Sequence, residues 1–350
     1  MAVIYTYFKE LKEKGASDLH MVIGFPPLIR QKGELVPLEH EVLTPETNRA
    51  ILYEILTDDQ KTVFEADYDF DMAYELPGEA RFRCNFFHQH RGVGAVFRII
   101  PTDILTLEDL NLPAVLKEIA MFKNGLVLVT GPTGSGKSTT LAAMIDYINK
   151  NHAAHIVTIE DPLEFVHQNK KCLFTQREIG THARSFADAL KVAIREDPDI
   201  ILVGEMRDLD TISLALTCAE FGILVFGTLH TNSAAKTVDR IINAFPTDQQ
   251  AQTRMMLSES LRAVVAQQLL RAKFGRGRCA ANEILIGSQA LASMIRENKT
   301  SQIGSLMQTG TNAGMQTMDQ HLKQLVDEGT VSGRDAYEKA IDKNLFAHYK

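Results

Sequence analysis

The residues with the clearest chemistry in this chain form the run Gly131-Pro-Thr-Gly-Ser-Gly-Lys137-Ser138. This run has the spacing G-x-x-x-x-G-K-[ST] of a phosphate-binding loop. Glycines allow backbone N–H groups to turn inward around an anion, and a helix that follows the loop adds its positive end. In such a loop Lys137 would place its charge beside the β and γ phosphates of ATP, and the Ser138 hydroxyl would bind Mg²⁺.

The flanking residues decide between a phosphate loop and a glycine-rich turn that matches the pattern by chance. The run 126–130 is short, apolar and β-branched, which is typical of a buried parallel strand. After the loop, Leu141, Ile145 and Ile148 recur at helical spacing. The order of strand, loop and helix favours nucleotide binding. We expect the contacts to come from Gly131, Pro132, Thr133, Gly134, Ser135, Gly136, Lys137, Ser138 and Thr139.

Hydrolysis of ATP also requires a group that orients the attacking water. The apolar run that begins at Asp199 ends in Glu205. In an open α/β sheet the carboxyl ends of the strands line the ligand crevice, so we interpret Glu205 as the residue that polarises water. The alternative is that Glu205 caps the helix that follows.

Two further strand ends carry polar groups. Glu160, Asp161 and Glu164 follow an apolar run, and three carboxylates this close repel one another unless a cation shares the site. The alternative is a solvated turn, since Asp-Pro is common in turns. His230 follows the run 223–227 and is either structural or a sensor of the γ phosphate.

Apolar runs at 126–130, 156–160, 200–203 and 223–227 alternate with helical patterns. This alternation predicts a parallel sheet covered on both faces, the α/β class. Beyond it we predict one long helix over about residues 249–270, then a hairpin-like segment and short helices.

The first hundred residues predict a different unit, a small α+β domain without a catalytic motif. A helix is expected over residues 4–14 and another from Thr44-Pro45, where an N-cap residue precedes proline. The pattern from residue 68 to residue 100 favours strands. We therefore divide the chain into a domain at 1–100, a linker at 101–112 and an ATPase domain with C-terminal helical elements at 113–350.

Three arginines, Arg81, Arg83 and Arg98, lie on the predicted strands of the first domain. They are either ordinary surface residues or arginine fingers that reach the phosphate of a neighbouring subunit.

The composition limits the functional class. With 350 residues and a formal net charge of -7, the chain lacks the basic excess of most nucleic-acid-binding proteins, and we expect no nucleic-acid partner. Its four cysteines are scattered, which indicates neither a zinc site nor a disulfide framework. We see no signal peptide and no apolar run long enough to span a bilayer. These features predict a soluble, cytoplasmic protein.

Taken together, these stretches resemble the secretion-ATPase superfamily and most closely its type IV pilus retraction ATPases (PilT-type). In the first domain the resemblance rests on Gly15-Ala-Ser-Asp-Leu-His20, Pro26-Pro27, Arg81-Phe-Arg83 and Val96-Phe-Arg98. In the second it rests on the phosphate loop and on the segments 158–167, 197–208 and 227–231.

The resemblance implies a RecA-like P-loop ATPase core preceded by a small PAS-like α+β domain, and a homohexameric ring. It also implies that Glu205 is the catalytic carboxylate, that Glu164 acts at Mg²⁺ and water, and that His230 lies in the His box. Arg83 and Arg98 match the arginines that contact phosphate from the next subunit. The implied partner is a polytopic inner-membrane platform protein at the pilus base, where the ATPase would be peripheral to the membrane.

The chain departs from the family pattern at two places. Gly222-Ile223 replaces the usual Gly-His at the start of the His-box strand, and the run Ala290–Glu297 keeps only the ending of the usual retraction motif. An accessory pilus motor paralogue or another secretion-type ATPase is therefore an alternative to a principal retraction motor with a role in twitching motility. Alternatives from other classes are a nucleic-acid translocase and a small-molecule phosphotransferase.

Overall fold

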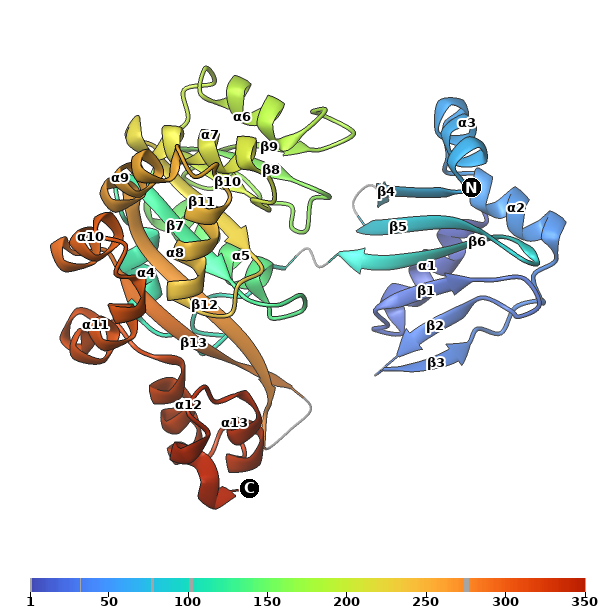
Figure 1. Ribbon diagram of the computed structural model, residues 1–350. Coiled ribbons are helices and arrows are strands. Elements are labelled where there is room, and N and C mark those ends of the chain that lie inside the picture. Colours follow the sequence, from blue (N-terminus) through green and yellow to red (C-terminus); the bar gives the residue numbers. More distant parts are fainter. Residues whose placement is uncertain (1, 32, 77–78, 101–102, 274–276, 350) are drawn as a thin grey trace. The chain divides into compact units, whose positions relative to one another are not determined.

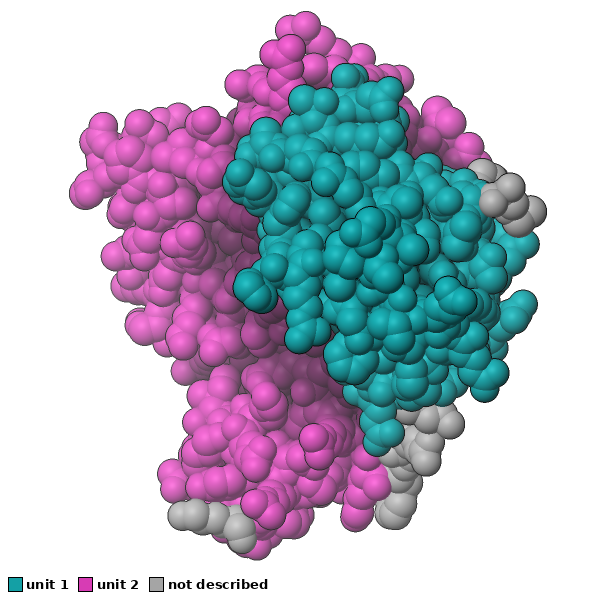
Figure 2. Space-filling view, turned by 90° about the vertical axis from the view of Figure 1, so that its right-hand side faces the viewer, with its two compact units in different colours: residues 1–103, 164–166 teal, residues 104–163, 167–350 magenta. Residues whose placement is uncertain are grey.

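A computed structural model describes residues 2–31, 33–76, 79–100, 103–273 and 277–349. The chain divides into two compact units, which are described separately (Figure 1, Figure 2). The first contains residues 1–103 and 164–166, and the second contains residues 104–163 and 167–350. Pro101 and Thr102 of the predicted linker lie outside the described residues, so the linker stays a prediction.

The first unit is built on an antiparallel sheet with the strand order β3-β2-β1-β6-β5-β4. The predicted start at Thr44-Pro45 is confirmed, because Thr44 caps the second helix with Pro45 at its first position. The elements of this unit are α1 (Ile4–Glu13), β1 (Asp18–Met21), β2 (Leu28–Gln31), β3 (Glu34–Pro37), α2 (Pro45–Tyr53), α3 (Asp58–Asp67), β4 (Asp69–Leu76), β5 (Ala80–Gln89) and β6 (Gly92–Ile100).

The two faces of this sheet differ in chemistry because strand residues alternate between them. Phe82 of β5 and Phe97 of β6 are fully buried and pack with Phe8 of α1. The rings of Phe8 and Phe82 stack with their centroids 4.0 Å apart. Arg83 and Arg98 each follow one of these buried phenylalanines and are exposed on the other face of the sheet.

The second unit is built on a mixed sheet with the strand order β13-β12-β7-β11-β10-β8-β9. Among the described residues of this sheet, the strands pair in parallel except for β12 and β13, which are antiparallel. The strands are β7 (Gly125–Thr130), β8 (His155–Glu160), β9 (Leu173–Glu178), β10 (Ile200–Val203), β11 (Leu224–Leu229), β12 (Leu261–Arg271) and β13 (Arg278–Ile286). The helices around this sheet are α4 (Val115–Ala120), α5 (Lys137–Asn151), α6 (Phe186–Ala193), α7 (Leu209–Glu220), α8 (Ala234–Asn243) and α9 (Gln250–Ser260).

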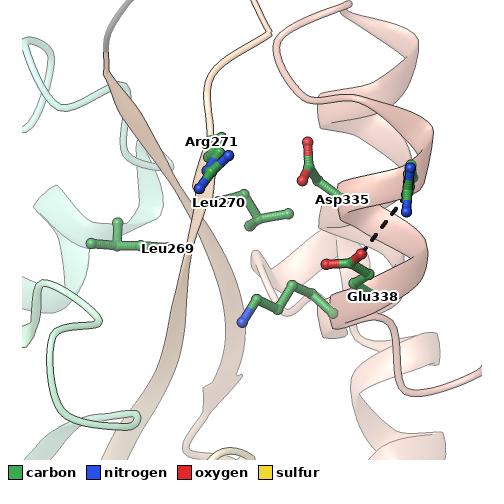
Figure 3. A pocket seen from close by; sticks show the side chains of 7 residues that line it. Leu269, Leu270, Arg271, Asp335 and Glu338 are labelled. Carbon is green, nitrogen blue, oxygen red and sulfur yellow. Dashed lines mark ion pairs between the residues drawn. The ribbon is translucent and has the colours of Figure 1, made fainter.

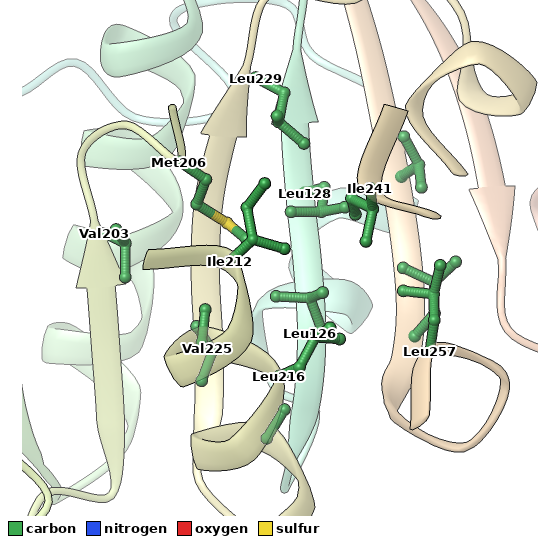
Figure 4. Close-up of a cluster of buried hydrophobic side chains, with 14 of the residues drawn as sticks. Leu126, Leu128, Val203, Met206, Ile212, Leu216, Val225, Leu229, Ile241 and Leu257 are labelled. Carbon is green, nitrogen blue, oxygen red and sulfur yellow. The ribbon is translucent and has the colours of Figure 1, made fainter. Parts of the chain in front are cut away.

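Two hydrophobic clusters cover the two faces of this sheet. Leu126 and Leu128 of β7 pack with Leu216 of α7 and Ile241 of α8 (Figure 4). Their neighbours Val127 and Val129 belong to the cluster on the other face, together with the apolar side of α5. All of these β7 residues are fully buried. The predicted parallel strands and the α/β class are thus confirmed.

The predicted long helix over 249–270 is wrong. Its first half is α9, but the chain then enters β12, which runs beside β7 and pairs with β13. Leu261–Arg271 contains Leu, Ala, Gln and Arg, which have good helix propensity. Burial between two strands outweighs that local preference.

The chain continues past β13 into short helical elements. The last of them pack on the far ends of β12 and β13 through a separate cluster that includes Leu270, Met318 and Phe346. Within the described ranges, no helix has the length and apolar character needed to span a bilayer. The elements are α10 (Gln289–Arg296), η1 (Thr300–Gln302), α11 (Ile303–Thr309), η2 (Thr311–Ala313), α12 (Met318–Asp327), α13 (Gly333–Lys339) and η3 (Lys343–Tyr349).

Candidate functional site: a phosphate loop beside a carboxylate cluster

The phosphate loop joins the carboxyl end of β7 to the first turn of α5. Gly131, Gly134 and Gly136 have φ angles of 148°, 77° and 85°, a region that other residues rarely enter. At Gly131 a Cβ atom would also lie 2.3 Å from the main-chain oxygen of Gln267. Glycine is therefore required here, and the chain leads from the loop into the positive end of α5.

Lys137, the first residue of α5, is folded over the loop that precedes it. Its Nζ donates to the carbonyl oxygens of Gly131 at 2.9 Å and Pro132 at 3.2 Å. An anionic phosphate oxygen is a stronger acceptor for an ammonium group than a neutral carbonyl. Lys137 thus stands at the loop in a position to bind phosphate. Ser138 and Thr139 are half-buried on the same turn of the helix.

Glu205, just after β10, lies in a cluster with the side chains of Arg207 and His230. Its Oε2 lies 2.6 Å from a guanidinium nitrogen of Arg207, and its Oε1 lies 2.9 Å from Nε2 of His230. The hydrogen bond from Arg207 is the main cause that holds the pKa of Glu205 below its ordinary value. Glu205 is therefore ionised near neutral pH, the form in which a carboxylate can accept a proton.

The sheet brings this cluster next to the phosphate loop. β11 lies between β7 and β10, with Leu229 opposite Thr130 and Gly227 opposite Val203. The three parallel strands end at the same edge, so the loop, His230 and Glu205 follow neighbouring strand ends. The N–H of Met206 also donates to the carbonyl of Thr228 at 3.0 Å, which ties the segment around Glu205 to β11.

The three carboxylates after β8 lie in different surroundings. Glu160 ends β8 and is buried, with its Cα against Gly204, the residue before Glu205. Asp161 is exposed and helps to raise the pKa of Arg207, after the larger effect of Glu205. Glu164 is exposed and belongs to the first unit, so its predicted role at Mg²⁺ stays a prediction.

Arg83 and Arg98 are directly opposite each other on β5 and β6, and Arg98 is opposite Asp18 of β1. Nε of Arg98 donates to Oδ1 of Asp18 at 2.8 Å, while the Ser17 hydroxyl donates to Oδ2 at 2.7 Å. Burial, the largest single influence, acts to raise the pKa of Asp18, but these two hydrogen bonds offset it and the pKa is lowered. Asp18 thus orients an arginine whose side chain is 70% exposed.

The oxygen ligands that the second unit offers suit an Mg²⁺ ion that is bound mainly by the phosphates of a nucleotide. Across the described ranges, no three His, Cys, Asp or Glu side chains lie together as a ready-made metal site. Mg²⁺ in nucleotide sites uses few protein ligands, typically a hydroxyl or a carboxylate, besides phosphate oxygens and water. The Ser138 hydroxyl at the loop and the carboxylates at the sheet edge are donors of this kind.

The two departures from the family pattern lie in ordinary structural settings. Ile223 is buried just before β11 in the cluster of Leu126 and Leu128. The run that resembles the retraction motif forms most of α10, where Arg296 donates to the hydroxyl of Ser258 at 3.3 Å. Both positions are packed into the second unit.

Sequence reasoning gave no role to Asp18, Arg207 or Gln267, which support the predicted site residues. Asp18 and Arg207 act through side chains whose partners depend on strand register and loop geometry. Gln267 lies in the segment mistaken for a helix. Its only signal was a pair of glutamines inside an apolar run.

A separate pocket lies between the end of β12 and α13 (Figure 3). Its charged side chains have both signs, and Arg334 pairs with Glu338 at 4.0 Å. Because the lining carries both positive and negative side chains, its charge does not indicate which class of ligand would bind. The pocket is lined by Leu269, Leu270, Arg271, Arg334, Asp335, Glu338 and Lys339.

Comparison with known proteins places this site in a family. The family model for "Type II/IV secretion system protein" matches residues 2–343. The "Type IV pilus retractation ATPase PilT" of Pseudomonas aeruginosa is 55% identical over 333 residues, which are 94% of this chain and 95% of that protein. The "Type IV pilus ATPase PilU" of the same organism is 42% identical over 332 residues, 95% of this chain and 87% of that protein.

Two solved structures match this chain over 97% of its length. A crystal structure of the pilus retraction motor PilT with bound ADP has a TM-score of 0.92 and 46% identity, covering 97% of this chain and 98% of that one. The ATPase DotB of Legionella pneumophila has a TM-score of 0.81 and 27% identity, covering 97% of this chain and 95% of that one. The chain therefore belongs to the type II/IV secretion system protein family and is a nucleotide-binding ATPase.

Proposed function

We propose that this chain is a type IV pilus retraction ATPase, which couples ATP hydrolysis to the removal of pilin subunits from the fibre. The observation that carries the proposal is the likeness to a retraction ATPase across nearly the whole of both chains. The lower identity to PilU favours the retraction type over another pilus ATPase. The alternative is an accessory pilus motor, and the cellular experiment below distinguishes it from a retraction ATPase.

In this proposal ATP binds with its phosphates on the loop and its hydrolysis begins with a water molecule held by Glu205. Glu205 accepts the proton of the attacking water, because it is ionised and lies at the edge of the sheet where the loop ends. His230, bound to the other carboxylate oxygen, senses the γ phosphate and passes its presence to α8. Mg²⁺, held by Ser138 and Glu164, would neutralise the phosphate charge.

The arginines of the first unit complete the site from the next subunit of a homohexamer. Arg83 and Arg98 form an exposed pair, with Arg98 oriented by Asp18 and with guanidinium nitrogens left for a phosphate. Such arginines stabilise the charge that develops as the γ phosphate departs. The ring would act in the cytoplasm on a polytopic inner-membrane platform protein at the pilus base.

The catalytic assignment is tested with Lys137→Ala and Glu205→Gln. Lys137→Ala is expected to lose ATP binding, whereas Glu205→Gln binds ATP and fails to turn it over. Glu220→Gln, an exposed glutamate at the end of α7, is the matched control and keeps the wild-type rate. Normal turnover by Glu205→Gln would remove Glu205 as the base. A rate that rises on addition of DNA or RNA would favour a nucleic-acid translocase.

The cellular role is tested in a piliated strain that lacks its own retraction ATPase. Expression of this chain is expected to restore pilus retraction and twitching, and expression of Glu205→Gln is not. If the chain restores neither although it hydrolyses ATP, the accessory role replaces the retraction role.

A further inference from the structure

The phosphate loop rests on a buried side chain from a strand more than a hundred residues further along. Gln267 of β12 is 2% exposed, and its Nε2 donates to the carbonyl oxygen of Ser135 at 2.7 Å. The carbonyl can only accept, so the amide must present its nitrogen to the loop. The side-chain amide of Gln267 can therefore make this hydrogen bond in only one of its two flipped orientations.

The other end of the same amide is held by two groups. Oε1 of Gln267 accepts from the Thr140 hydroxyl of α5 at 2.8 Å and from Nδ2 of Asn282 of β13 at 3.0 Å. Thr140 and Asn282 are buried as well. Three hydrogen bonds thus fix the amide between the loop, the helix that follows it and the neighbouring strand.

Gln267 also touches the glycines of the loop. A Cβ atom at Gly131 would lie 2.3 Å from its main-chain oxygen, and a Cβ atom at Gly136 would lie 2.9 Å from its Nε2. The loop is therefore packed against Gln267 at its first glycine, at the Ser135 carbonyl and at its last glycine.

The contact at Ser135 sets the direction of one N–H group. In a planar trans peptide the C=O and the next N–H point to opposite sides. Since the Ser135 carbonyl points at Gln267, the Gly136 N–H points away from it. Gly136 directly precedes Lys137, so this N–H belongs to the part of the loop that meets an anion at the start of α5.

We propose that Gln267 is the positioning residue of the phosphate loop, which keeps the Ser135–Gly136 peptide turned so that its N–H faces the nucleotide phosphates. The inference rests on nucleotide binding at this loop. It adds a residue that acts through the loop backbone and does not touch the phosphates.

The test is Gln267→Glu, which keeps the shape of the side chain, combined with a pH series. A protonated glutamic acid donates to the Ser135 carbonyl, and an ionised one cannot and adds a negative charge beneath the loop. Burial at this position raises the pKa of a carboxyl toward the neutral range, so the pH series covers both forms. Binding of fluorescent mant-ADP in the presence of Mg²⁺ is measured from pH 6 to pH 9. We expect near wild-type affinity at the acidic end and a Kd raised at least about fivefold at the basic end, the cost of an unmet buried hydrogen bond.

Matched variants separate the possible outcomes. Gln268→Glu makes the same charge change on the next residue, which faces the other side of the strand, and is expected to follow the wild-type pH profile. Gln267→Leu cannot bond at any pH and is expected to bind weakly throughout. A Gln267→Glu profile that matches the wild type over the whole range overturns the proposal, as does wild-type affinity in Gln267→Leu.

Lys137→Ala distinguishes failure of this inference from failure of nucleotide binding at the loop. If Lys137→Ala abolishes binding and Gln267→Glu changes nothing, only the role of Gln267 is wrong. If Lys137→Ala binds like the wild type, the loop itself is not the nucleotide site.

Discussion

Glu205 is held on both sides, by Arg207 on one carboxylate oxygen and by His230 on the other. The ion pair with Arg207 keeps the carboxylate ionised at a pH below that at which an ordinary glutamate takes up a proton. The same ion pair makes Glu205 a weaker base. In the proposed role of Glu205 as the base, Arg207 would extend activity to lower pH and would reduce the proton affinity of the carboxylate.

Removal of this arginine shifts the pH dependence of hydrolysis. In Arg207→Ala the pKa of Glu205 rises, so the carboxylate is protonated at a higher pH and the acidic limb of the rate profile moves to higher pH. ATPase rates measured from pH 5 to pH 8 check this. Arg195→Ala, an exposed arginine elsewhere in the second unit, is the control. An unmoved limb in Arg207→Ala would show that another group sets it.

His167 gives the second unit a pH-dependent stability. Its ring is buried and stacks on Phe174 with the centroids 4.8 Å apart. Burial lowers the pKa of His167 to about 4. The unfolded chain, with an ordinary histidine pKa near 6.5, binds more protons between these values, so the free energy of unfolding falls as pH drops from about 6.5 to about 4. The full loss is about 3 kcal/mol.

Urea unfolding at pH 8 and pH 5 measures this loss. In His167→Phe the ring packing is kept and the titrating group is gone, so the difference between the two midpoints should shrink. His152→Asn removes an exposed histidine and should leave the difference as it is in the wild type. Equal pH dependence in His167→Phe and the wild type would contradict the assignment.

Among the elements, α7 begins at Leu209, and its N-cap, Asp208, lies three residues after Glu205. The carboxylate of Asp208 accepts from the N–H of Thr211 at 2.8 Å and from its hydroxyl at 3.0 Å. This cap fixes where the loop that carries Glu205 and Arg207 ends. Loss of such a cap typically costs about 1 kcal/mol.

Asp208→Ala should therefore open the first turn of α7. Hydrogen exchange followed by mass spectrometry should show about fivefold faster exchange in the first turn, as expected for about 1 kcal/mol. Asp210→Ala removes an exposed aspartate from the same turn without a cap and should have a smaller effect. Equal exchange in the two variants would mean that the cap does not hold the turn.

The elements show which parts of the fold the sequence could predict. The runs at β7, β8, β10 and β11 are apolar and β-branched, so local preference and burial agree. In β12 they disagree, because Gln267, Gln268 and their neighbours suit a helix equally well. This segment becomes a strand because it pairs with β7 and β13, and both partners lie outside the segment itself.

The candidate site divides in the same way. The loop and Glu205 were predictable because each follows a strand in a recognisable order along the chain. The ion pair of Asp18 with Arg98 depends on register between β1 and β6, and the support of Ser135 by Gln267 depends on a strand order that periodicity does not contain.

At the scale of the whole molecule, the proposal divides each site between two subunits. A variant with Lys137→Ala and a double variant with Arg83→Ala and Arg98→Ala should each be inactive as a ring. When they are mixed before assembly, some sites combine an intact loop with intact arginines. With random mixing about a quarter of the sites are complete, because each needs two independent subunits in a heterologous ring.

ATPase activity of the mixture checks this arrangement. Recovery toward about a quarter of the wild-type rate supports arginines supplied by the next subunit. A mixture that stays inactive, although mixed rings are shown to form, would place the arginines and the loop in one subunit. Mixing Lys137→Ala with Glu205→Gln is the control. No recovery is expected, because the loop and Glu205 of each site come from the same subunit, and every subunit in this mixture lacks one of them.

The position of β7 in the sheet has a consequence for how the protein is made. Its two neighbours come from far along the chain, since Leu126 lies beside Val225 on one side and beside Leu261 on the other. During translation the P-loop strand is complete early but keeps an open edge until β12 has left the ribosome. The sheet that supports the phosphate loop is therefore completed only late in synthesis, because β12 ends at residue 271 of 350.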